Sequence, residues 1–336
     1  MISIHAIGET GNEEQFHDVA YIRLFLPLKY LCEKEKFKLT TGKTFAGFEN
    51  KDIYFIQRSW SKNINTNSVK AFLKIIRSGK KKLIYEIDDN LLDNPDISSE
   101  KKMVIRCLAG NADVVIVSTL ALKKRLEFLN KNITVIPNFM DLNVINMKRD
   151  KQNKNNKIII GYMGTSTHQK DFKMIKLPLM KIINKYKSKI SFELIGAIEN
   201  ESEIRSLANT KIHNRGAIND YFSFWRWMND NCFWDIGIAP LKNDEFTKCK
   251  SDIKYLDYSA LGMAGVYSKH PSYEYNIKHK ETGLLADNTC EAWQSALEEL
   301  ICNENLRNSI KLKARNDLMQ NRILQNNTDL WLKVIK

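Results

Sequence analysis

The chain has 336 residues, is 43% hydrophobic and 27% charged, and carries a formal net charge of +13 at pH 7. This length suits two domains of ordinary size, and the composition is that of a soluble globular protein. The positive charge favours anionic partners, which are nucleic acid, phosphorylated substrates or an anionic membrane face.

Membrane insertion, secretion and zinc binding are disfavoured by the sequence. No apolar run reaches the roughly 20 residues of a membrane-spanning helix. The first residues, MISIHAIGETG, lack the basic and long apolar regions of a signal peptide. The six cysteines are scattered without a CxxC pair, which argues for reduced thiols in the cytosol and against a zinc site. We therefore expect a cytoplasmic protein.

Short apolar runs alternate with helical patterns over residues 1–147, which we expect to form the first domain. This alternation predicts a parallel sheet covered by helices. Arg23 lies in the apolar segment 21–31 and is expected to be buried. Residues 41–44 resemble the end of a P-loop, but Phe37 stands where its first glycine should be, which excludes a nucleoside triphosphatase. The expected strands are 2–7, 52–57, 82–87, 112–118 and 133–137, and the helical patterns include 69–78 and 120–129.

Asp88 and Asp89 follow the expected strand 82–87 directly. Ligands of open parallel sheets bind beyond the carboxyl ends of the strands, so both aspartates are candidates for polar chemistry. The alternative interpretation is a turn or helix-cap role. A metal-binding acidic pair is a third option, which the absence of another apparent ligand cluster in the sequence disfavours.

Residues 148–156 are polar, charged and without periodicity, and are the predicted linker. The alternation of strands and helices restarts at residue 157 and defines a second domain over 157–318, including a short helix at 201–207. A last helix is expected over 319–336, with Leu324, Leu330, Trp331 and Val334 on its apolar side.

A loop after the first strand of the second domain is a candidate phosphate site. It contains Gly164, Thr165, His168 and Lys170 and leads into a helical pattern at 172–186. The free N–H groups and partial positive charge at a helix N-terminus can hold an anion. The alternative is an ordinary turn closed by a Ser or Thr cap.

A second loop of this kind lies between the apolar run 236–240 and the helical pattern 253–261. Lys248, Lys250 and Ser251 precede that helix and could add donors to its N-terminus. Alternatively, Ser251 or Asp252 is simply the N-cap and the lysines are solvated. The two loops together favour a nucleoside diphosphate group in this domain, facing the first domain across a cleft.

The chain resembles two-domain GT-B glycosyltransferases and is most similar to glycosyltransferase family 4. The resemblance covers nearly the whole chain and rests on an ordered set of segments. These are Tyr21–Pro27, Tyr85–Asp89, Ala112–Ser118, Ile136–Asn138, Gly161–Gly164 with His168 and Asp171, Asp235–Pro240, Lys250–Asp257 with Gly262, and Thr282–Leu285.

The resemblance implies an α/β GT-B fold, with two Rossmann-like domains and a C-terminal helix that crosses back to the first. It implies a nucleotide-sugar donor bound by the second domain, an acceptor bound by the first on the side of Arg23, and a retaining reaction without a metal or other cofactor. Asp88 and Asp89 would then lie beside the transferred sugar. The donor residues would be Gly164, Thr165, His168, Lys170, Lys250, Ser251, Lys254 and Asp257.

One motif departs from the family pattern. Its paired glutamates would fall at Cys249 and Asp257, so the second carboxylate is present and could hold the donor ribose. The first glutamate is replaced by a cysteine, which removes the usual contact to the donor sugar. Lys250, Ser251 and Lys254 occupy the neighbourhood instead, as in a surface-polysaccharide subgroup of the family.

The function that we expect is sugar transfer from a nucleoside-diphosphate sugar to a glycan acceptor. We expect this acceptor to be lipid-linked and part of a surface polysaccharide. The basic chain would work in the cytoplasm, at an anionic membrane face. The alternatives are a sugar-nucleotide epimerase of the same fold and a non-catalytic carbohydrate- or nucleic-acid-binding protein. Nucleic acid is not expected, because lysines and arginines do not cluster with aromatic residues.

Overall fold

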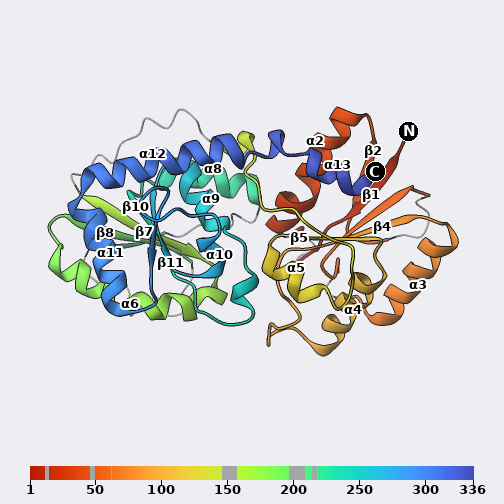
Figure 1. The fold of residues 1–336 in the computed structure, drawn as a ribbon, viewed down its shortest axis with the longest axis horizontal. Helices are drawn as coiled ribbons and strands as arrows, with labels where there is room; N and C mark the ends of the chain where they lie inside the picture. Colours follow the sequence, from red (N-terminus) through yellow and green to blue (C-terminus); the bar gives the residue numbers. More distant parts are fainter. Residues whose placement is uncertain are drawn as a thin grey trace. The chain divides into compact units, whose positions relative to one another are not determined.

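The computed structural model describes residues 1–11, 15–45, 50–61, 63–145, 157–196, 209–213, 218 and 220–336 (Figure 1). The predicted linker 148–156 and the predicted helix 201–207 lie outside these residues. The chain divides into two compact units. The first unit contains Met1–Leu142, Lys248–Ser251 and Ile323–Lys336, and the second contains Asn143–Thr247 and Asp252–Arg322.

The first unit is built on a six-stranded parallel sheet in the order β2-β1-β3-β4-β5-β6. Most strands are continuous apolar runs, because a parallel sheet is covered on both faces. Strand β2 was not predicted, since its pattern is mostly exposed and gives no apolar signal. The bounds are β1 Ser3–Ile7, β2 Lys38–Gly42, β3 Ile53–Gln57, β4 Lys82–Ile87, β5 Val114–Val117 and β6 Ile133–Val135.

Helices cover this sheet, and three of them begin at a side-chain cap. Asn65, Ser98 and Thr119 each accept a hydrogen bond from a backbone N–H in the first turn of α3, α4 and α5. Pro27 lies in the first turn of α2, where a proline is tolerated. The bounds are α1 Asp18–Ala20, a π-helix Tyr21–Phe25, α2 Leu26–Glu35, α3 Thr66–Ser78, α4 Ser99–Asn111 and α5 Leu120–Leu126.

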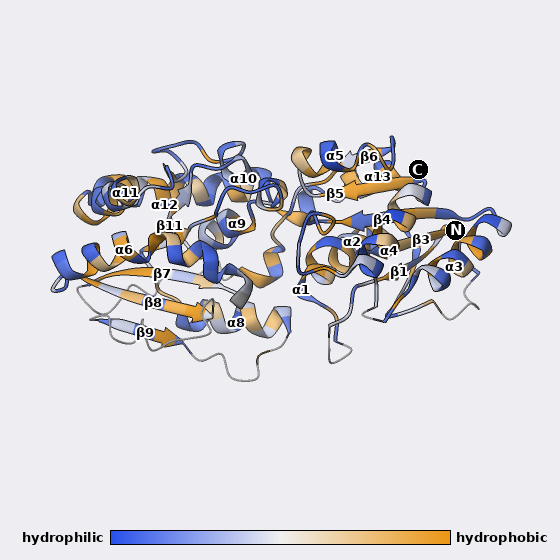
Figure 2. Ribbon diagram, turned by 90° about the horizontal axis from the view of Figure 1, so that it is seen from below, coloured by the Kyte–Doolittle hydropathy of each residue, from blue (hydrophilic) through white to orange (hydrophobic). Residues whose placement is uncertain are grey.

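The second unit repeats the architecture, with a parallel sheet in the order β12-β11-β10-β7-β8-β9. Figure 2 shows β5 of the first sheet and β8 of the second largely in the hydrophobic colour. Gly161 in β7 allows Trp234 to pack against the strand, because a Cβ at this position would lie 1.7 Å from the indole. The bounds are β7 Ile158–Gly164, β8 Ile190–Gly196, β9 Thr210–His213, β10 Ile236–Ala239, β11 Ala264–Ser268 and β12 Leu284–Ala286.

The helices of the second unit include the aromatic segment at 221–228, whose Tyr221, Trp225 and Met228 are buried. No helix among the described residues combines the length and the apolarity needed to cross a membrane. The bounds are α6 Gln169–Lys185, α8 Tyr221–Asn231, α9 Ile253–Ala260, α10 Pro271–Glu274, α11 Cys290–Cys302 and α12 Glu304–Asn321.

The tail is not the single helix that was predicted over 319–336. Helix α12 ends at Asn321, a 3-10 turn follows at Leu324–Asn326, and α13 spans Asp329–Ile335. The break occurs where Ile323 forms a parallel bridge with Met140 of the first unit. Helix α13 then packs beside α2, with Trp331 buried against Phe139 (Figure 1).

Candidate functional site

Charged side chains gather at the carboxyl ends of the strands in the first unit. The order of strands places β1 between β2 and β3, so the chain direction across the sheet reverses there. Ligands of open α/β sheets bind at such a point. We call the group found there the carboxyl-edge network. Its members are Glu9, Arg23, Arg58, Glu86, Asp88, Asp89, Lys101 and Asn138.

Arg58 is the centre of this network. Its Nε and Nη2 donate to the two carboxylate oxygens of Asp88 at 2.6 and 3.0 Å, and its Nη1 donates to Glu9 Oε2 at 3.0 Å. Nη2 also lies 3.7 Å from Asp89 Oδ2. The backbone of Arg58 is left-handed, with φ of 46°, which costs a non-glycine residue about 1 kcal/mol. Such strain is retained where surrounding contacts fix the residue, as these ion pairs do.

Glu9 anchors the other side of Arg58. Its carboxylate also accepts from Lys101 Nζ and Ser59 Oγ, both at 2.9 Å. Burial alone would raise the pKa of Glu9, but the Arg58 and Lys101 cations overcome this and hold the pKa at about 2. Glu9 is therefore a fixed negative charge that orients Arg58.

Arg23 was expected on the acceptor side, and the structure places it inside the unit at 1% exposure. Its Nε donates to Glu86 Oε1 at 2.7 Å, and its Nη1 donates to Ile136 O at 2.7 Å and to Asn138 Oδ1 at 3.0 Å. Arg23 is thus the most deeply buried cation of the network and orients Asn138 and Glu86.

Residues Lys248–Ser251, which we call the strap, belong to the first unit although both neighbouring segments belong to the second. They were predicted with the donor loops of the second domain. In the structure Lys250 Nζ lies 3.4 Å from Asp89 Oδ2, and Asn138 Nδ2 donates to Ser251 Oγ at 2.8 Å. The fold therefore groups Lys250 and Ser251 with Asp88 and Asp89.

The other predicted donor loop lies at the corresponding reversal in the second sheet, where β7 stands between β10 and β8. His168 Nδ1 lies 2.8 Å from Asp171 Oδ2, and the buried Asp171 also accepts from Lys242 N at 2.9 Å. Thr165 and Lys170 are exposed beside Gly164 and the first turn of α6. The loop therefore presents a helix N-terminus, an oriented imidazole and an exposed ammonium.

Lys254 and Asp257 come from α9 of the same unit. Lys254 Nζ donates to Met163 O, at the end of β7, and lies 5.5 Å from the centre of the Tyr162 ring. Asp257 is largely buried, and the described part of the chain supplies its carboxylate with no hydrogen-bond donor. Burial raises the pKa of Asp257 to about 7, with Lys254 opposing the shift and Asp252 adding to it.

Sequence reasoning missed Glu9, Arg58 and Lys101. Arg58 follows β3 directly, as Asp88 follows β4, so the same carboxyl-end rule could have identified it. Glu9 lies just beyond β1, so the same rule could have identified it as well. Lys101 on α4 carries no local signal, because only the fold brings it to Glu9.

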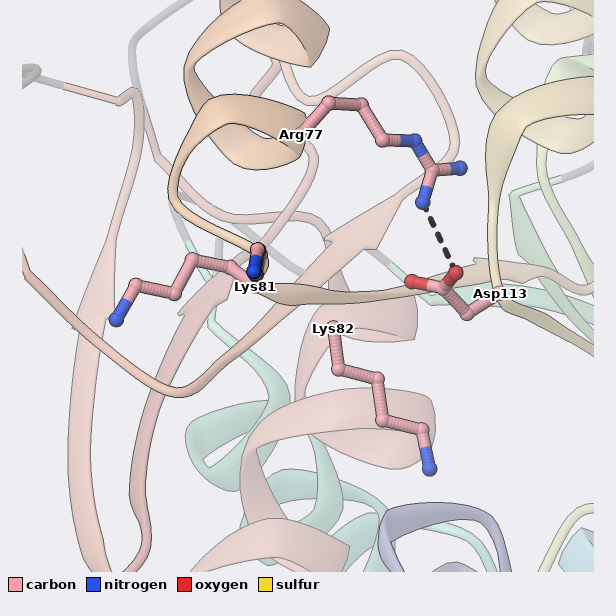
Figure 3. Close-up of a pocket in the computed structure, with 5 residues that line it drawn as sticks. Arg77, Lys81, Lys82 and Asp113 are labelled. Atoms are coloured by element: carbon pink, nitrogen blue, oxygen red, sulfur yellow. Dashed lines mark hydrogen bonds and ion pairs between the residues drawn. The ribbon is translucent and has the colours of Figure 1, made fainter.

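An open hollow of about 430 Å³ lies elsewhere in the first unit, near the amino end of β4. It is lined by Arg77, Lys80, Lys81, Lys82 and Asp113. Figure 3 shows Arg77 turned to Asp113, while Lys81 and Lys82 point in different directions. Lys82 Nζ donates to Ile335 O at 3.0 Å. These cations do not converge on one point, so we place the candidate site at the carboxyl edges.

Among the described residues, no group of three or more His, Cys, Asp or Glu side chains is placed to hold a metal ion. No protein-family model matches the sequence, and no curated protein matches it either.

Solved structures match the fold over the whole chain. HepE of Anabaena, crystallised with UDP and glucose, has a TM-score of 0.68 at 12% identity and covers 100% of this chain and 99% of its own. The sucrose-phosphate synthase of Thermosynechococcus elongatus has a TM-score of 0.68 at 11% identity, covering 100% and 98%. A glycosyltransferase of Rickettsia africae ESF-5 has a TM-score of 0.65 at 12% identity, covering 100% and 99%.

At these identities the likeness establishes the fold alone. Together with the two six-stranded parallel sheets, it identifies two Rossmann-like domains of the GT-B fold. The predicted fold class is therefore confirmed.

Proposed function

We propose that this protein is a glycosyltransferase that takes a sugar from a nucleoside-diphosphate sugar. The fold supports this, since its structural neighbour HepE was crystallised with UDP-glucose. Because one fold serves many activities, the proposal rests on the site. The observation that carries it is a set of polar side chains in the second unit, which we call the donor cluster. His168 follows β7 and is held by Asp171, Lys254 donates to Met163 O near the end of β7, and Lys254 acts electrostatically on Asp257.

The side chains of the donor cluster and of the neighbouring loop suit the diphosphate and the ribose of a nucleoside-diphosphate sugar. A diphosphate would lie at the N-terminus of α6, beside Thr165, His168 and Lys170, where backbone N–H groups and cations stabilise negative charge. Asp257 has a carboxylate ready to accept hydrogen bonds from the two ribose hydroxyls. As the glycosidic bond breaks, charge develops on the departing diphosphate, and these fixed donors would stabilise it without a metal.

We assign the acceptor to the first unit, where Asp89 is the more accessible carboxylate of the Asp88–Asp89 pair, at 21% against 13% exposure. The acceptor that we propose is a lipid-linked glycan of a surface polysaccharide, with retention of the anomeric configuration. The net charge of +13 supports work at an anionic membrane face. Sedimentation with anionic vesicles at low salt, lost at high salt, tests the membrane part of this proposal.

The donor site can be tested by thermal unfolding with UDP, GDP, ADP, CDP and TDP, with and without magnesium. Binding to the native state raises the midpoint, by an amount equivalent to about 2.7 kcal/mol at a hundredfold excess over Kd. We expect one diphosphate to act independently of magnesium. The rise should shrink in Lys254→Ala and Asp257→Asn and persist in Lys80→Ala, an exposed lysine of the other unit. Absence of any rise, with diphosphates and with intact nucleotide sugars, would refute the proposal.

The products distinguish transfer from epimerisation. The matching nucleotide sugar is incubated alone and then with glycan acceptors, and the products are separated by chromatography. A transferase should form a new glycoside only with an acceptor. Conversion of the donor into an isomeric nucleotide sugar without acceptor would instead identify an epimerase.

A further inference from the structure

Cys249 stands where the resembled family has a glutamate, and the structure buries it in the first unit. Its side chain is 5% exposed and joins the hydrophobic core cluster that contains Leu91, Leu92 and Leu122. Its carbonyl oxygen accepts a hydrogen bond from Thr119 Oγ1 at 2.9 Å. Its thiol also forms a hydrogen bond with Asn90, and Asp93 and Arg125 lie close enough to act on it electrostatically. A larger, charged carboxylate at this position would have to be buried, which is unfavourable.

The strap is attached residue by residue to three neighbouring strand-end loops. Cys249 is held by Thr119 after β5, Lys250 lies against Asp89 after β4, and Asn138 after β6 donates to Ser251. The attachments to Cys249 and Ser251 flank Lys250 on both sides. The position of the ammonium is therefore determined by its neighbours as well as by its own ion pair.

The strap also balances the charge of the carboxyl-edge network. Among the described residues, the network contains four carboxylates and, apart from the strap, three cations. Lys250 is the fourth and brings the sum to zero. The carboxylates are Glu9, Glu86, Asp88 and Asp89, and the three cations are Arg23, Arg58 and Lys101. A displaced strap would leave an excess negative charge, which opposes the approach of an anionic substrate.

We propose that Cys249 is a positioning residue, a buried anchor that seats the strap and thereby places Lys250 in the candidate site. The loss of the family glutamate is then a change of role from ligand contact to anchoring. The consequence for transfer rests on the proposed function, in which the acceptor lies in the first unit beside Asp89, the carboxylate that Lys250 faces. The seating of the strap does not depend on that function and can be measured separately.

Thiol labelling measures whether the strap is seated. Native protein is treated with a maleimide for increasing times, and each cysteine is followed by mass spectrometry. Cys249 should react far more slowly than the exposed Cys302. Thr119→Val removes the hydrogen bond to the strap together with the cap of α5, and should speed the labelling of Cys249 at least about fivefold. Thr119→Ser keeps both hydrogen bonds and should not.

Cys32 in the first unit and Cys232 in the second are buried controls, and their labelling should stay slow in both variants. If Cys249 reacts as fast as Cys302 in the native protein, or is unaffected by Thr119→Val, the anchoring proposal is overturned.

Sugar transfer to the acceptor that the product assay identifies measures the consequence for the site. Cys249→Glu should lower kcat/KM for the acceptor by the same factor as Lys250→Ala, and the double variant should lower it no further, because both changes take the same ammonium away from Asp89. Cys249→Val keeps a buried side chain of similar size and should retain the native kcat/KM.

The two measurements separate the two proposals. Independent, additive losses in the double variant, or equal losses in Cys249→Val and Cys249→Glu, would contradict positioning of Lys250 by Cys249. If the native protein binds neither UDP nor another nucleoside diphosphate, the proposed function fails, and the labelling result alone decides whether the strap is anchored.

Discussion

The two adjacent aspartates of the site differ in what holds them. Asp88 receives two hydrogen bonds from Arg58, and its backbone oxygen accepts from Ser118 Oγ at 2.6 Å. The carboxylate of Asp89 lies 3.4 Å from Lys250 Nζ, which is longer than the two hydrogen bonds to Asp88, and Asp89 is more exposed than Asp88. Asp88 therefore fixes the geometry of the strand end, and Asp89 is the carboxylate available to a sugar or acceptor.

This difference predicts opposite phenotypes for two conservative changes. Asp88→Asn removes one of the two carboxylates that receive hydrogen bonds from the largely buried Arg58, and should lower the free energy of unfolding by about 3 kcal/mol. Asp89→Asn should cost less than about 1 kcal/mol but lower kcat by about 10² or more, if the carboxylate assists proton transfer. Urea unfolding and donor turnover measure the two effects. Equal loss of stability in both variants would contradict the division of roles.

Asp257 should make stability depend on pH. Its pKa is about 7 in the folded protein and 3.8 for the ordinary carboxyl group, so the folded state holds the proton more tightly. This contribution is present below pH 4 and is lost as pH rises through about 7. Between pH 5 and 8 the native protein should lose about 3 kcal/mol relative to Asp257→Asn. Asp230→Asn, an exposed change in the same unit, is the control for urea unfolding at both pH values.

The same titration should appear in ligand binding. Ribose hydroxyls that donate to Asp257 favour its ionised form, so UDP affinity should rise with pH more in the native protein than in Asp257→Asn. If UDP affinity depends on pH equally in the two proteins, the assignment of Asp257 to the ribose site is wrong.

Among the elements, α9 and α12 are joined by a buried ion pair. Asp252 precedes α9 but its side chain does not cap that helix. Instead it receives Arg322 Nη1 and Nη2 at 2.8 and 2.9 Å, and Asn276 Nδ2 at 2.8 Å. The alternative interpretation, in which the Asp252 side chain caps α9, is therefore wrong, and this side chain instead joins the ends of two helices.

Breaking that pair should destabilise the second unit. Arg322→Ala leaves Asp252 buried with a lost partner and should cost about 3 to 5 kcal/mol. Arg315→Ala, which removes a longer hydrogen bond from the same helix to Ala260 O, should cost much less. Hydrogen exchange followed by mass spectrometry should show faster exchange in α9 and α12. An Arg322→Ala protein as stable as Arg315→Ala would contradict this role of the ion pair.

At the scale of the whole molecule, the first unit is completed by segments from three parts of the chain. Helix α13 contributes Trp331, which is 1% exposed. Lys34 of α2 and Asp329 of α13 form an ion pair at 2.7 Å, but this pair is exposed and adds little stability. The apolar contact is therefore the main attachment of the tail.

Trp331→Ala should lower the stability of the first unit by about 3 to 5 kcal/mol, the usual cost of deleting a buried aromatic side chain. Lys333→Ala on the same helix is exposed and should change little. Peptides from β1 to β4 should exchange hydrogen faster in Trp331→Ala, while those from β7 to β11 keep native rates. Unchanged exchange in β1 to β4 would show that the tail does not support the first unit.

From the sequence alone, most of the alternating strands and helices and the location of Asp88 and Asp89 at a strand end could be predicted. These follow from local patterns, because strands buried on both faces are continuous apolar runs and carboxyl ends carry the polar groups. The GT-B class came from the resemblance of ordered segments to a known family, and the exposed strand β2 gave no signal. The tertiary structure alone decided that Glu9, Arg58 and Lys101 meet, that the strap joins the first unit, and that the tail breaks at Arg322. Those outcomes depend on contacts between positions far apart in the chain, for which no local periodicity exists.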